Sequence, residues 1–408
     1  MRSVLLVAQL SPPSELVAAR RVAGFAKYLA RLGHRVTVLT SRVSGEGKIE
    51  GAAGVVRAND LLLTPLNWRR RHFAALSGQA GGGYAPPSAL ERVVVPDLAA
   101  VTWLPFALPA ALRLARAERF DCVVTSSPPA STHLIGRALR RQGVCWIADF
   151  RDGWTFERQE QAWPLGLQRR ADAGLERHVL SRARALVAVT EPIAADLRAR
   201  FDAPVEVITN GFDPEDEASG AEGLLDDSRH SLVHTGRMAA GRSSPKALLA
   251  ALRKLREDSP ELAARLEVVF AGPLSAEERE LLAAADLDGL ARTVGALPRS
   301  EALGLQRQAD SLLVVTEGAR RRSVATGKLF EYLAAGRPVL VLGEETEAAR
   351  IVERAGAGFS ASATDPASIA DALRHLLESP PETGEAPAEF AYPELSSRLA
   401  DLIERVCR

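Results

Sequence analysis

Residues 326–331 combine charged side chains with a predicted helix start. Thr326 suits the N-cap position, which places Gly327 and Lys328 in the first turn of the helix. The free N–H groups and the dipole of a helix start attract anions, and the Lys328 ammonium adds a full charge. Glu331 follows on the same face, where its carboxylate could accept hydrogen bonds from two vicinal hydroxyls, as in a ribose. The spacing therefore indicates a site for a nucleoside diphosphate.

A second interpretation is that Glu331 pairs with Lys328 on a solvated helix face. Composition alone favours this interpretation, because ion pairs between residues three positions apart are common on helices. The residues by themselves leave both interpretations open.

Polar side chains also follow two predicted strands in the first half of the chain. The strand at residues 144–148 leads into the run DFRDGW, which contains Asp149 and Arg151. The strand at residues 122–126 leads into a Ser-Ser-Pro-Pro turn and a helix with His133 in its first turn. Ligands of parallel sheets bind at the carboxyl ends of strands, which makes these residues candidates. Alternatively, the Asp and Arg form an internal ion pair, and the histidine lies at the surface or the core edge.

Three short motifs match ligand-binding patterns by their letters alone. The glycines at residues 356–361 follow a helix and lead into a strand, whereas a dinucleotide fingerprint runs from a strand into a helix. The Thr-Gly-Lys at residues 326–328 lacks the first glycine and the last Ser or Thr of a P-loop. Asp286 and Asp288 form a DxD at a predicted helix end, which we interpret as a solvated turn. We therefore expect no metal site.

The elements that position these residues form two series of alternating strands and helices. An acidic, aperiodic stretch separates the series, and residues 43–101 look irregular. The pattern predicts an α/β protein with two doubly wound parallel sheets. We expect domains at residues 1–210 and 230–388, a linker at 211–229 and a C-terminal helix at 389–408. Strands are predicted at residues 3–9, 35–40, 122–126, 144–148, 185–190, 205–209, 231–235, 266–271, 311–316 and 339–343.

Composition excludes several classes of protein. With 408 residues, of which 47% are hydrophobic, the chain can fill two cores. The 51 basic and 51 acidic residues cancel, so no net field recruits nucleic acid. Three distant cysteines predict neither a disulfide framework nor a zinc site, which suits a cytoplasmic protein. No signal peptide or membrane span is expected, and only residues 61–73 and 103–106 could make weak peripheral membrane contacts.

The run GKLFEYLAAGRPVL at residues 327–340 resembles the donor-site helix of GT-B glycosyltransferases of the GT4 type. The similarity extends over most of the chain, including residues 33–40, 235–246 and the closing helix. It implies a GT-B fold, in which two Rossmann-like domains face an interdomain cleft and the C-terminal helix returns to the first domain. It also implies that Gly327 and Lys328 bind the donor diphosphate and that Glu331 binds the ribose.

Further donor-site residues follow from the same resemblance. Residues 235–246 resemble the loop whose basic side chains contact the diphosphate, which makes Arg237, Arg242 and Lys246 candidates. Residues 290–298 resemble the strand and loop that pack against the nucleobase, with Gly295 and Leu297 on that side.

Ser323 departs from the family pattern. Many members have a Glu eight residues before the ribose-binding Glu, where it contacts the donor sugar. Here that position is Ser323, eight residues before Glu331. Without this Glu, the chain lacks the carboxylate that contacts the donor sugar in the family, so sugar recognition and activity are expected to differ from the family pattern.

The DFRDGW run at residues 149–154 is similar to the Asp-Phe-Arg-Asp-x-Trp run of a bacterial envelope-polysaccharide branch of the family. The resemblance implies that Asp149 or Arg151 contacts sugar hydroxyls. It also implies a retaining transferase that needs neither metal nor cofactor and passes a sugar from a nucleotide diphosphate sugar to a sugar or lipid-linked glycan acceptor. A lipid-linked acceptor would place the protein at the inner face of the membrane. A sugar-nucleotide epimerase and a non-catalytic GT-B partner protein are the alternatives.

Overall fold

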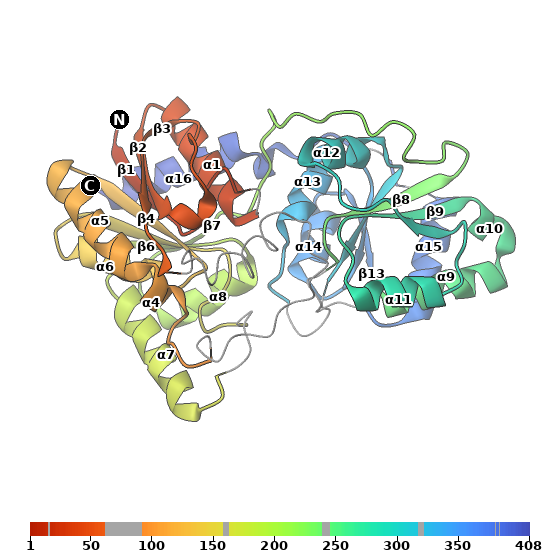
Figure 1. Ribbon diagram of the computed structural model, residues 1–408, viewed down its shortest axis with the longest axis horizontal. Helices are drawn as coiled ribbons and strands as arrows, with labels where there is room; N and C mark the ends of the chain where they lie inside the picture. The colour runs from red at the N-terminus through yellow and green to blue at the C-terminus, as the bar shows by residue number, and fades with distance from the viewer. Residues whose placement is uncertain are drawn as a thin grey trace. The chain divides into compact units, whose positions relative to one another are not determined.

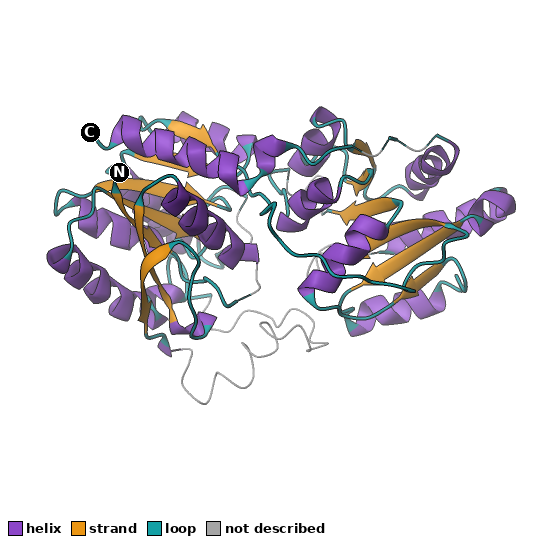
Figure 2. Ribbon diagram, turned by 90° about the horizontal axis from the view of Figure 1, so that it is seen from above, coloured by secondary structure: helices purple, strands orange, loops and turns teal. Residues whose placement is uncertain are grey.

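The computed structural model describes residues 1–14, 17–61, 92–157, 163–238, 245–316, 322–379, 381–382 and 384–408. These residues form two compact units. The first contains the described residues up to Asp213 together with Glu389–Arg408, and the second contains those of Pro214–Ala388. Each unit is a parallel sheet between helices (Figures 1 and 2).

The first unit is built on a seven-stranded parallel sheet in the order β3-β2-β1-β4-β5-β6-β7. Its strands are β1 (Ser3–Val7), β2 (Arg35–Ser41), β3 (Ala52–Ala58), β4 (Cys122–Ser127), β5 (Cys145–Phe150), β6 (Ala185–Ala188) and β7 (Val205–Val207). Its helices are α1 (Val17–Arg31), α4 (Ala99–Thr102), α5 (Leu104–Ala117), α6 (Thr132–Arg140), α7 (Gly166–Leu180), α8 (Glu191–Arg200) and α16 (Tyr392–Val406).

Both faces of this sheet are buried, which explains why its strands read as continuous apolar runs. Val4 and Leu6 of β1 pack in a cluster with side chains of α1 and α16. Leu5 and Val7 point to the opposite face and pack with side chains of α5 and α6. The core of the first unit therefore lies on two sides of one sheet.

The C-terminal helix α16 belongs to the first unit. Tyr392 packs edge-on against Phe25 of α1, with ring centroids 6.0 Å apart. The carboxylate of Glu404, near the end of α16, accepts a 2.9 Å hydrogen bond from Arg2. The predicted return of this helix to the first domain is confirmed (Figure 1).

The second unit is a six-stranded parallel sheet in the order β10-β9-β8-β11-β12-β13. Its strands are β8 (His230–Thr235), β9 (Leu266–Ala271), β10 (Ala291–Thr293), β11 (Ser311–Val315), β12 (Val339–Leu342) and β13 (Gly358–Ala361). Its helices are α9 (Lys246–Asp258), α10 (Pro260–Ala264), α11 (Ala276–Ala284), α12 (Arg299–Gln308), α13 (Gly327–Ala335), α14 (Glu347–Arg354) and α15 (Pro366–Glu378).

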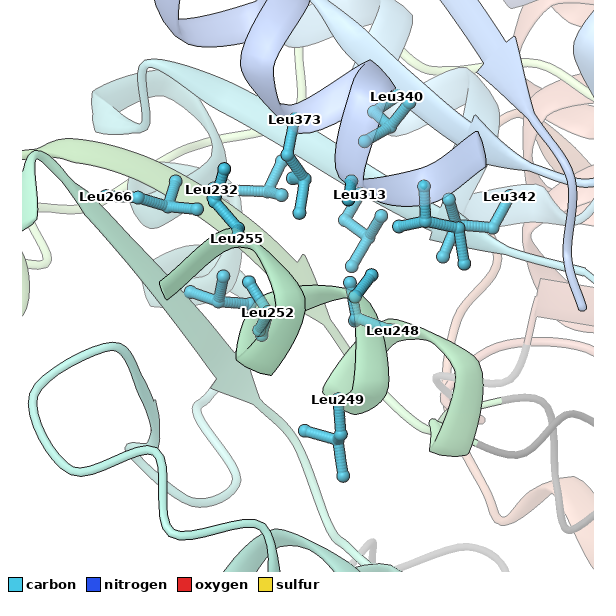
Figure 3. Packing of buried hydrophobic residues seen from close by; sticks show 14 of the residues in the cluster. Leu232, Leu248, Leu249, Leu252, Leu255, Leu266, Leu313, Leu340, Leu342 and Leu373 are labelled. Atoms are coloured by element: carbon cyan, nitrogen blue, oxygen red, sulfur yellow. The ribbon is translucent and has the colours of Figure 1, made fainter. Parts of the chain in front are cut away.

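One face of the second sheet is filled mainly by leucines (Figure 3). Leu252 and Leu255 of α9 and Leu373 of α15 meet Leu232 and Leu313 of the sheet, and all five are completely buried. Burying a leucine side chain contributes about 1.5–3 kcal/mol, so this cluster stabilises the sheet whose edge carries the candidate site.

The structure corrects three expectations about the first unit. Residues 52–58 form the edge strand β3, although the sequence around them looks irregular, because their Ala and Gly residues weaken the apolar signal. Trp103 is completely buried in the core, so a membrane contact through it is wrong. Cys145 and Cys407 form a disulfide, because α16 brings Cys407 beside β5.

The remaining membrane candidate, residues 61–73, lies outside the described residues except for Leu61, which is exposed. Among the described residues, no helix combines the length and apolar character needed to cross a bilayer.

Candidate functional site

The candidate donor site lies at the carboxyl edge of the second sheet. The loops after β8, β10 and β11 all leave the sheet at this edge, because the strands are parallel. The segment after β8 carries Arg237, the loop after β10 carries Gly295 and Leu297, and the segment after β11 leads to the start of α13. The predicted donor residues thus share one edge of one sheet.

The side chain of Lys328 reaches from α13 to the end of β8. Its Nζ donates to the carbonyl of Arg237 at 2.7 Å and lies 3.1 Å from Nε2 of His234. Gly236 passes beside it with φ +77°, a conformation that favours glycine, and a Cβ there would lie 3.7 Å from Nζ. Desolvation lowers the pKa of Lys328 to about 7. The amine is therefore held at a fixed place with its charge poised near neutral pH.

His234 is the neutral partner of this lysine. Its Nδ1 lies 2.9 Å from the carbonyl of Leu313, which can only accept, so Nδ1 carries the proton and Nε2 accepts from Lys328. Burial, together with the neighbouring Lys328 charge, lowers the pKa of His234 to about 3. The imidazole thus remains neutral and orients the lysine.

The start of α13 has the features of an anion site. Thr326 occupies the predicted N-cap position, with φ −67° and ψ 151°, and Gly327 is the first helical residue. The Thr326 side chain makes no capping hydrogen bond to the helix among the described residues. The first turn is therefore not closed by its own cap, which leaves the positive end of the helix dipole to a ligand.

Glu331 faces Arg299 rather than Lys328. The Glu331 carboxylate lies 3.3 Å from a guanidinium nitrogen of Arg299, the first residue of α12, and its side chain is only 11% exposed. Arg299 also contacts Asp216 at 2.6 Å. The alternative pairing of Glu331 with Lys328 is wrong for this structure, because the lysine is bound at the end of β8.

Two further side chains hold the end of β8 against the helices. The hydroxyl of Tyr332 accepts a 2.7 Å hydrogen bond from the backbone N–H of Thr235, and burial raises the pKa of Tyr332 to about 12. Gln306 of α12 donates to the Thr235 hydroxyl at 2.9 Å. The strand end that carries Gly236 and Arg237 is therefore fixed by α12 and α13.

The other predicted donor residues lie in the segments that follow β8 and β10. Arg237 is exposed directly after β8, and Lys246 begins α9, where its ammonium lies 3.9 Å from Glu277. Gly295 and Leu297 are half-buried in the loop after β10. Arg242 lies outside the described residues.

Ser323, the residue that departs from the family pattern, is buried just before α13.

In the first unit, Asp149 is part of a buried ion pair with Arg21. Two nitrogens of the Arg21 guanidinium donate to the two carboxylate oxygens at 2.7 and 3.0 Å, and Ser126 donates at 2.6 Å. Arg21 of α1 also donates to the carbonyls of Ile208 and Thr209. Asp149 thus joins β5 to α1 and to the segment after β7.

Arg151 and His133 both contact the carboxyl end of β4. Arg151 donates from Nε to the carbonyl of Ser127 at 3.0 Å, so the expected pair with Asp149 is replaced by backbone contacts. His133 is completely buried, with Nδ1 2.8 Å from the Thr125 hydroxyl and Nε2 2.9 Å from that of Ser127. Burial lowers its pKa to about 3. His133 is therefore neutral and lies in the core, not at the surface or the core edge.

The acidic DxD lies at the opposite edge of the second sheet from α13. It follows the end of α11 and precedes β10, so it is near the amino ends of the strands. Asp286 and Asp288 are exposed, while Leu287 between them is buried in the core. The interpretation as a solvated turn is confirmed, as is that of Gly356, which has φ +62° between α14 and β13.

Family comparisons agree with this architecture. The model described as "Glycosyltransferase Family 4" matches residues 18–216, and that described as "Glycosyl transferases group 1" matches residues 229–379. The chain belongs to the GT4-type GT-B glycosyltransferases. No curated protein matches the sequence.

Solved glycosyltransferases and related enzymes share the fold of this family member. A sucrose-phosphate synthase from Thermosynechococcus elongatus is 17% identical with a TM-score of 0.68, and 99% of each chain is covered. Anabaena HepE in complex with UDP and glucose is 12% identical with a TM-score of 0.63, covering 99% of this chain and 100% of that one. A putative UDP-N-acetylglucosamine 2-epimerase from Listeria monocytogenes is 13% identical with a TM-score of 0.59, covering 98% and 95%.

Sequence reasoning missed three side chains of this glycosyltransferase that position the candidates. His234 and Arg299 set the orientation of Lys328 and Glu331, and Arg21 binds Asp149. Along the chain, His234 is 94 positions from Lys328, Arg299 is 32 positions from Glu331, and Arg21 is 128 positions from Asp149. No local spacing marks such pairs. The only signal was the position of His234 near the carboxyl end of a predicted strand.

Proposed function

We propose that this glycosyltransferase moves a sugar, with retention of anomeric configuration, from a nucleotide diphosphate sugar to a hydroxyl acceptor. The observation that supports this proposal is the pair formed by Lys328 and Glu331 on α13. The lysine is held over the helix start by the end of β8, and the carboxylate is held one turn further along by Arg299. In this arrangement the lysine would contact the diphosphate and the carboxylate would contact the ribose.

In this proposal the diphosphate binds at the N–H groups of Gly327 and Lys328 and to the Lys328 ammonium. Arg237, Lys246 and Arg242 add positive charge from the segment after β8. Glu331 accepts hydrogen bonds from the ribose hydroxyls, and the base packs near Gly295 and Leu297.

The reaction needs stabilisation of a departing diphosphate. As the bond from the anomeric carbon to the diphosphate oxygen breaks, its electron pair moves to the diphosphate, and negative charge grows beside Lys328 and the helix start. The acceptor hydroxyl then forms a new bond to the same face of that carbon. Its proton passes to the diphosphate oxygen that has just left. Fixed positive groups of the protein thus take the place of a metal ion, and the departing diphosphate oxygen takes the place of a separate base.

We further propose that the acceptor is a sugar or a lipid-linked glycan and that the product is a polysaccharide or glycoconjugate. The support is the run at residues 149–154, which resembles that of an envelope-polysaccharide branch. Within this run, Arg151 is half-buried and is the residue best placed to reach a sugar hydroxyl, while Asp149 and His133 position the strand ends around it. A lipid-linked acceptor would place the protein on the cytoplasmic face of the membrane.

Incubation with a panel of UDP-, GDP- and ADP-sugars tests the proposal. We expect slow hydrolysis of one donor, and transfer once a fitting acceptor is added, both persisting in excess chelator. Lys328→Ala should lose turnover as well as binding, because charge on the leaving group grows toward the transition state. The double variant Asp286→Ala/Asp288→Ala is the matched control and should keep full activity. Loss of activity in chelator or in this control would contradict metal independence.

The same assay separates two other functions. An epimerase on this fold, as in the Listeria relative, would convert the sugar nucleotide to its epimer without an acceptor. A non-catalytic partner protein would bind or ignore the nucleotide and return it unchanged. The buried Ser323, in place of the carboxylate that contacts the sugar in the family, is the feature that favours the non-catalytic alternative. An epimerase would instead need acid/base carboxylates near the sugar.

A further inference from the structure

Five arginines surround an open cavity of about 490 Å³ at the amino edge of the first sheet. They come from the end of α6 and from the turn between α7 and β6, next to Ser181 and Ala183. This edge lies opposite to the one that carries Asp149 and Arg151, because all strands of the sheet are parallel. We call this arginine-lined cavity the basic cavity. Its arginines are Arg137, Arg140, Arg141, Arg182 and Arg184.

The positive charge of the basic cavity is not balanced by acidic side chains. By contrast, Arg200 of the same unit binds Glu176 and Asp196. Within the described part of the chain, no carboxylate forms an ion pair with any of the five. The ends of α6 and α7 each contribute about half a negative charge, which offsets about one of the five positive charges.

The guanidinium of Arg137 shows the effect of this unbalanced positive charge on one side chain. Its Nη1 is buried and has no hydrogen-bond partner among the described residues. Its Nη2 lies 2.7 Å from Nε2 of His178. Burial and the charges of Arg141 and Arg182 lower the pKa of Arg137. An anion in the cavity would relieve this repulsion, because a nearby opposite charge favours the charged guanidinium.

The lining indicates which anion fits. Guanidinium groups match phosphate oxygens in pairs, and the volume is typical of a small-molecule site. No aromatic side chain lines the cavity, so a nucleobase would find no stacking partner. The exposed large hydrophobic residues of the described chain, Leu165 and Leu167 among them, also lie outside the lining, which disfavours insertion into a bilayer. We propose that the basic cavity binds a soluble compound that carries two or more phosphate groups.

This site is separate from the donor site, which belongs to the second unit, and it does not depend on the proposed function. Inorganic pyrophosphate is a suitable probe. The donor site would also bind pyrophosphate, so the titration is carried out by calorimetry in the Lys328→Ala background. Hydrogen exchange with and without pyrophosphate then locates the binding in the unmodified protein.

We expect Arg141→Gln/Arg182→Gln to weaken pyrophosphate binding about tenfold or more, because two charge-assisted contacts are lost. The matched control is Arg113→Gln/Arg116→Gln, which removes the same charge from exposed positions on α5 and should bind as before. Pyrophosphate should slow amide exchange at residues 178–184. Arg137 is not replaced and keeps its contact with His178. The single variant Arg141→Gln serves if the double variant is unstable.

Three results would overturn the proposal. The first is equal affinity of the two double variants. The second is protection from exchange that leaves residues 178–184 unaffected. The third is flotation of the protein with vesicles of anionic phospholipid, lost in Arg141→Gln/Arg182→Gln, without any binding of pyrophosphate. That result would make the basic cavity a membrane contact.

Discussion

At the scale of single residues, Lys328 combines a fixed position with an unusual pKa. Its ammonium is oriented by a neutral histidine and a carbonyl, neither of which supplies the negative charge that would keep the pKa high. Desolvation therefore acts alone and brings the pKa to about 7. A bound diphosphate would reverse this shift, because an opposite charge favours the protonated amine.

Binding of a nucleoside diphosphate should consequently take up a proton above pH 7. With the free pKa near 7 and a higher bound pKa, the complex holds more protons than its components, so affinity falls by up to about tenfold per pH unit as pH rises above 7. Below pH 7 the amine is already charged and the effect fades. Calorimetry at pH 8 in buffers of different ionisation enthalpy measures the uptake. Lys328→Met should abolish it, and equal uptake by both proteins would contradict the assignment.

Glu331→Gln should weaken binding of the same ligand about tenfold or more, since hydrogen bonds to charged groups are worth about 1.5–3 kcal/mol. The fold should remain intact, because the hydrogen bond from the Thr235 N–H to the Tyr332 hydroxyl still joins α13 to β8. The control is Glu280→Gln, an equivalent charge change at an exposed position of α11. Unchanged affinity in Glu331→Gln would remove this carboxylate from the site.

The sequence allowed Lys328 and Glu331 to be found because they are three positions apart on one helix. Their partners could not be found in the same way. Arg299 reaches Glu331 from α12, and His234 reaches Lys328 from β8. Which of several arginines and histidines would arrive there depends on the sheet order, which local periodicity does not specify.

At the scale of elements, the pair of Arg21 and Asp149 joins α1 to β5. Removing one member of a buried ion pair leaves the other charge uncompensated, which typically costs about 3–5 kcal/mol. Asp149→Asn should therefore lower the free energy of unfolding of the first unit by a large part of this amount, as measured by urea denaturation. Asp152→Asn, in the same loop, is the control. Loss of activity in Asp149→Asn without loss of stability would show instead that Asp149 acts on substrate.

Elements with strong apolar runs were predictable from the sequence to within a few residues. The strands β4, β9 and β12 illustrate this, because each is short, β-branched or leucine-rich, and buried on both faces. The edge strand β3 was missed, since an edge needs less apolar surface and its Ala-Ala-Gly start resembles a loop. The start of α13 was placed correctly because Thr326 marks the N-cap position.

At the scale of the whole molecule, the disulfide between Cys145 and Cys407 bridges 262 positions of the chain. Native disulfides typically contribute about 2–5 kcal/mol, so a reductant should lower the stability of the first unit by about this amount. Cys145→Ser/Cys407→Ser should already be at the lower value and should not respond to reductant. Denatured, unreduced protein should show one free thiol, that of Cys122. Three free thiols would contradict the disulfide.

The expectation of unlinked cysteines failed because spacing along the chain carries no information about a helix that returns from the far end. Cys122 and Cys145 face each other on β4 and β5, and α16 adds the third sulfur, so that all three lie within 4.8 Å. The return of α16 was implied only by the family resemblance. The three sulfur atoms come together only because α16 returns to the first unit.

The hydrogen bond between Arg2 and Glu404 places the two ends of the chain side by side. A short peptide could therefore join them, and new ends could be opened between Asp213 and Pro214. In such a circular permutant, residues 389–408 would be translated directly before residue 1, so the described parts of each unit would follow one another without interruption. The first unit, which is now divided between the residues before Pro214 and Glu389–Arg408, could then be produced as one continuous segment.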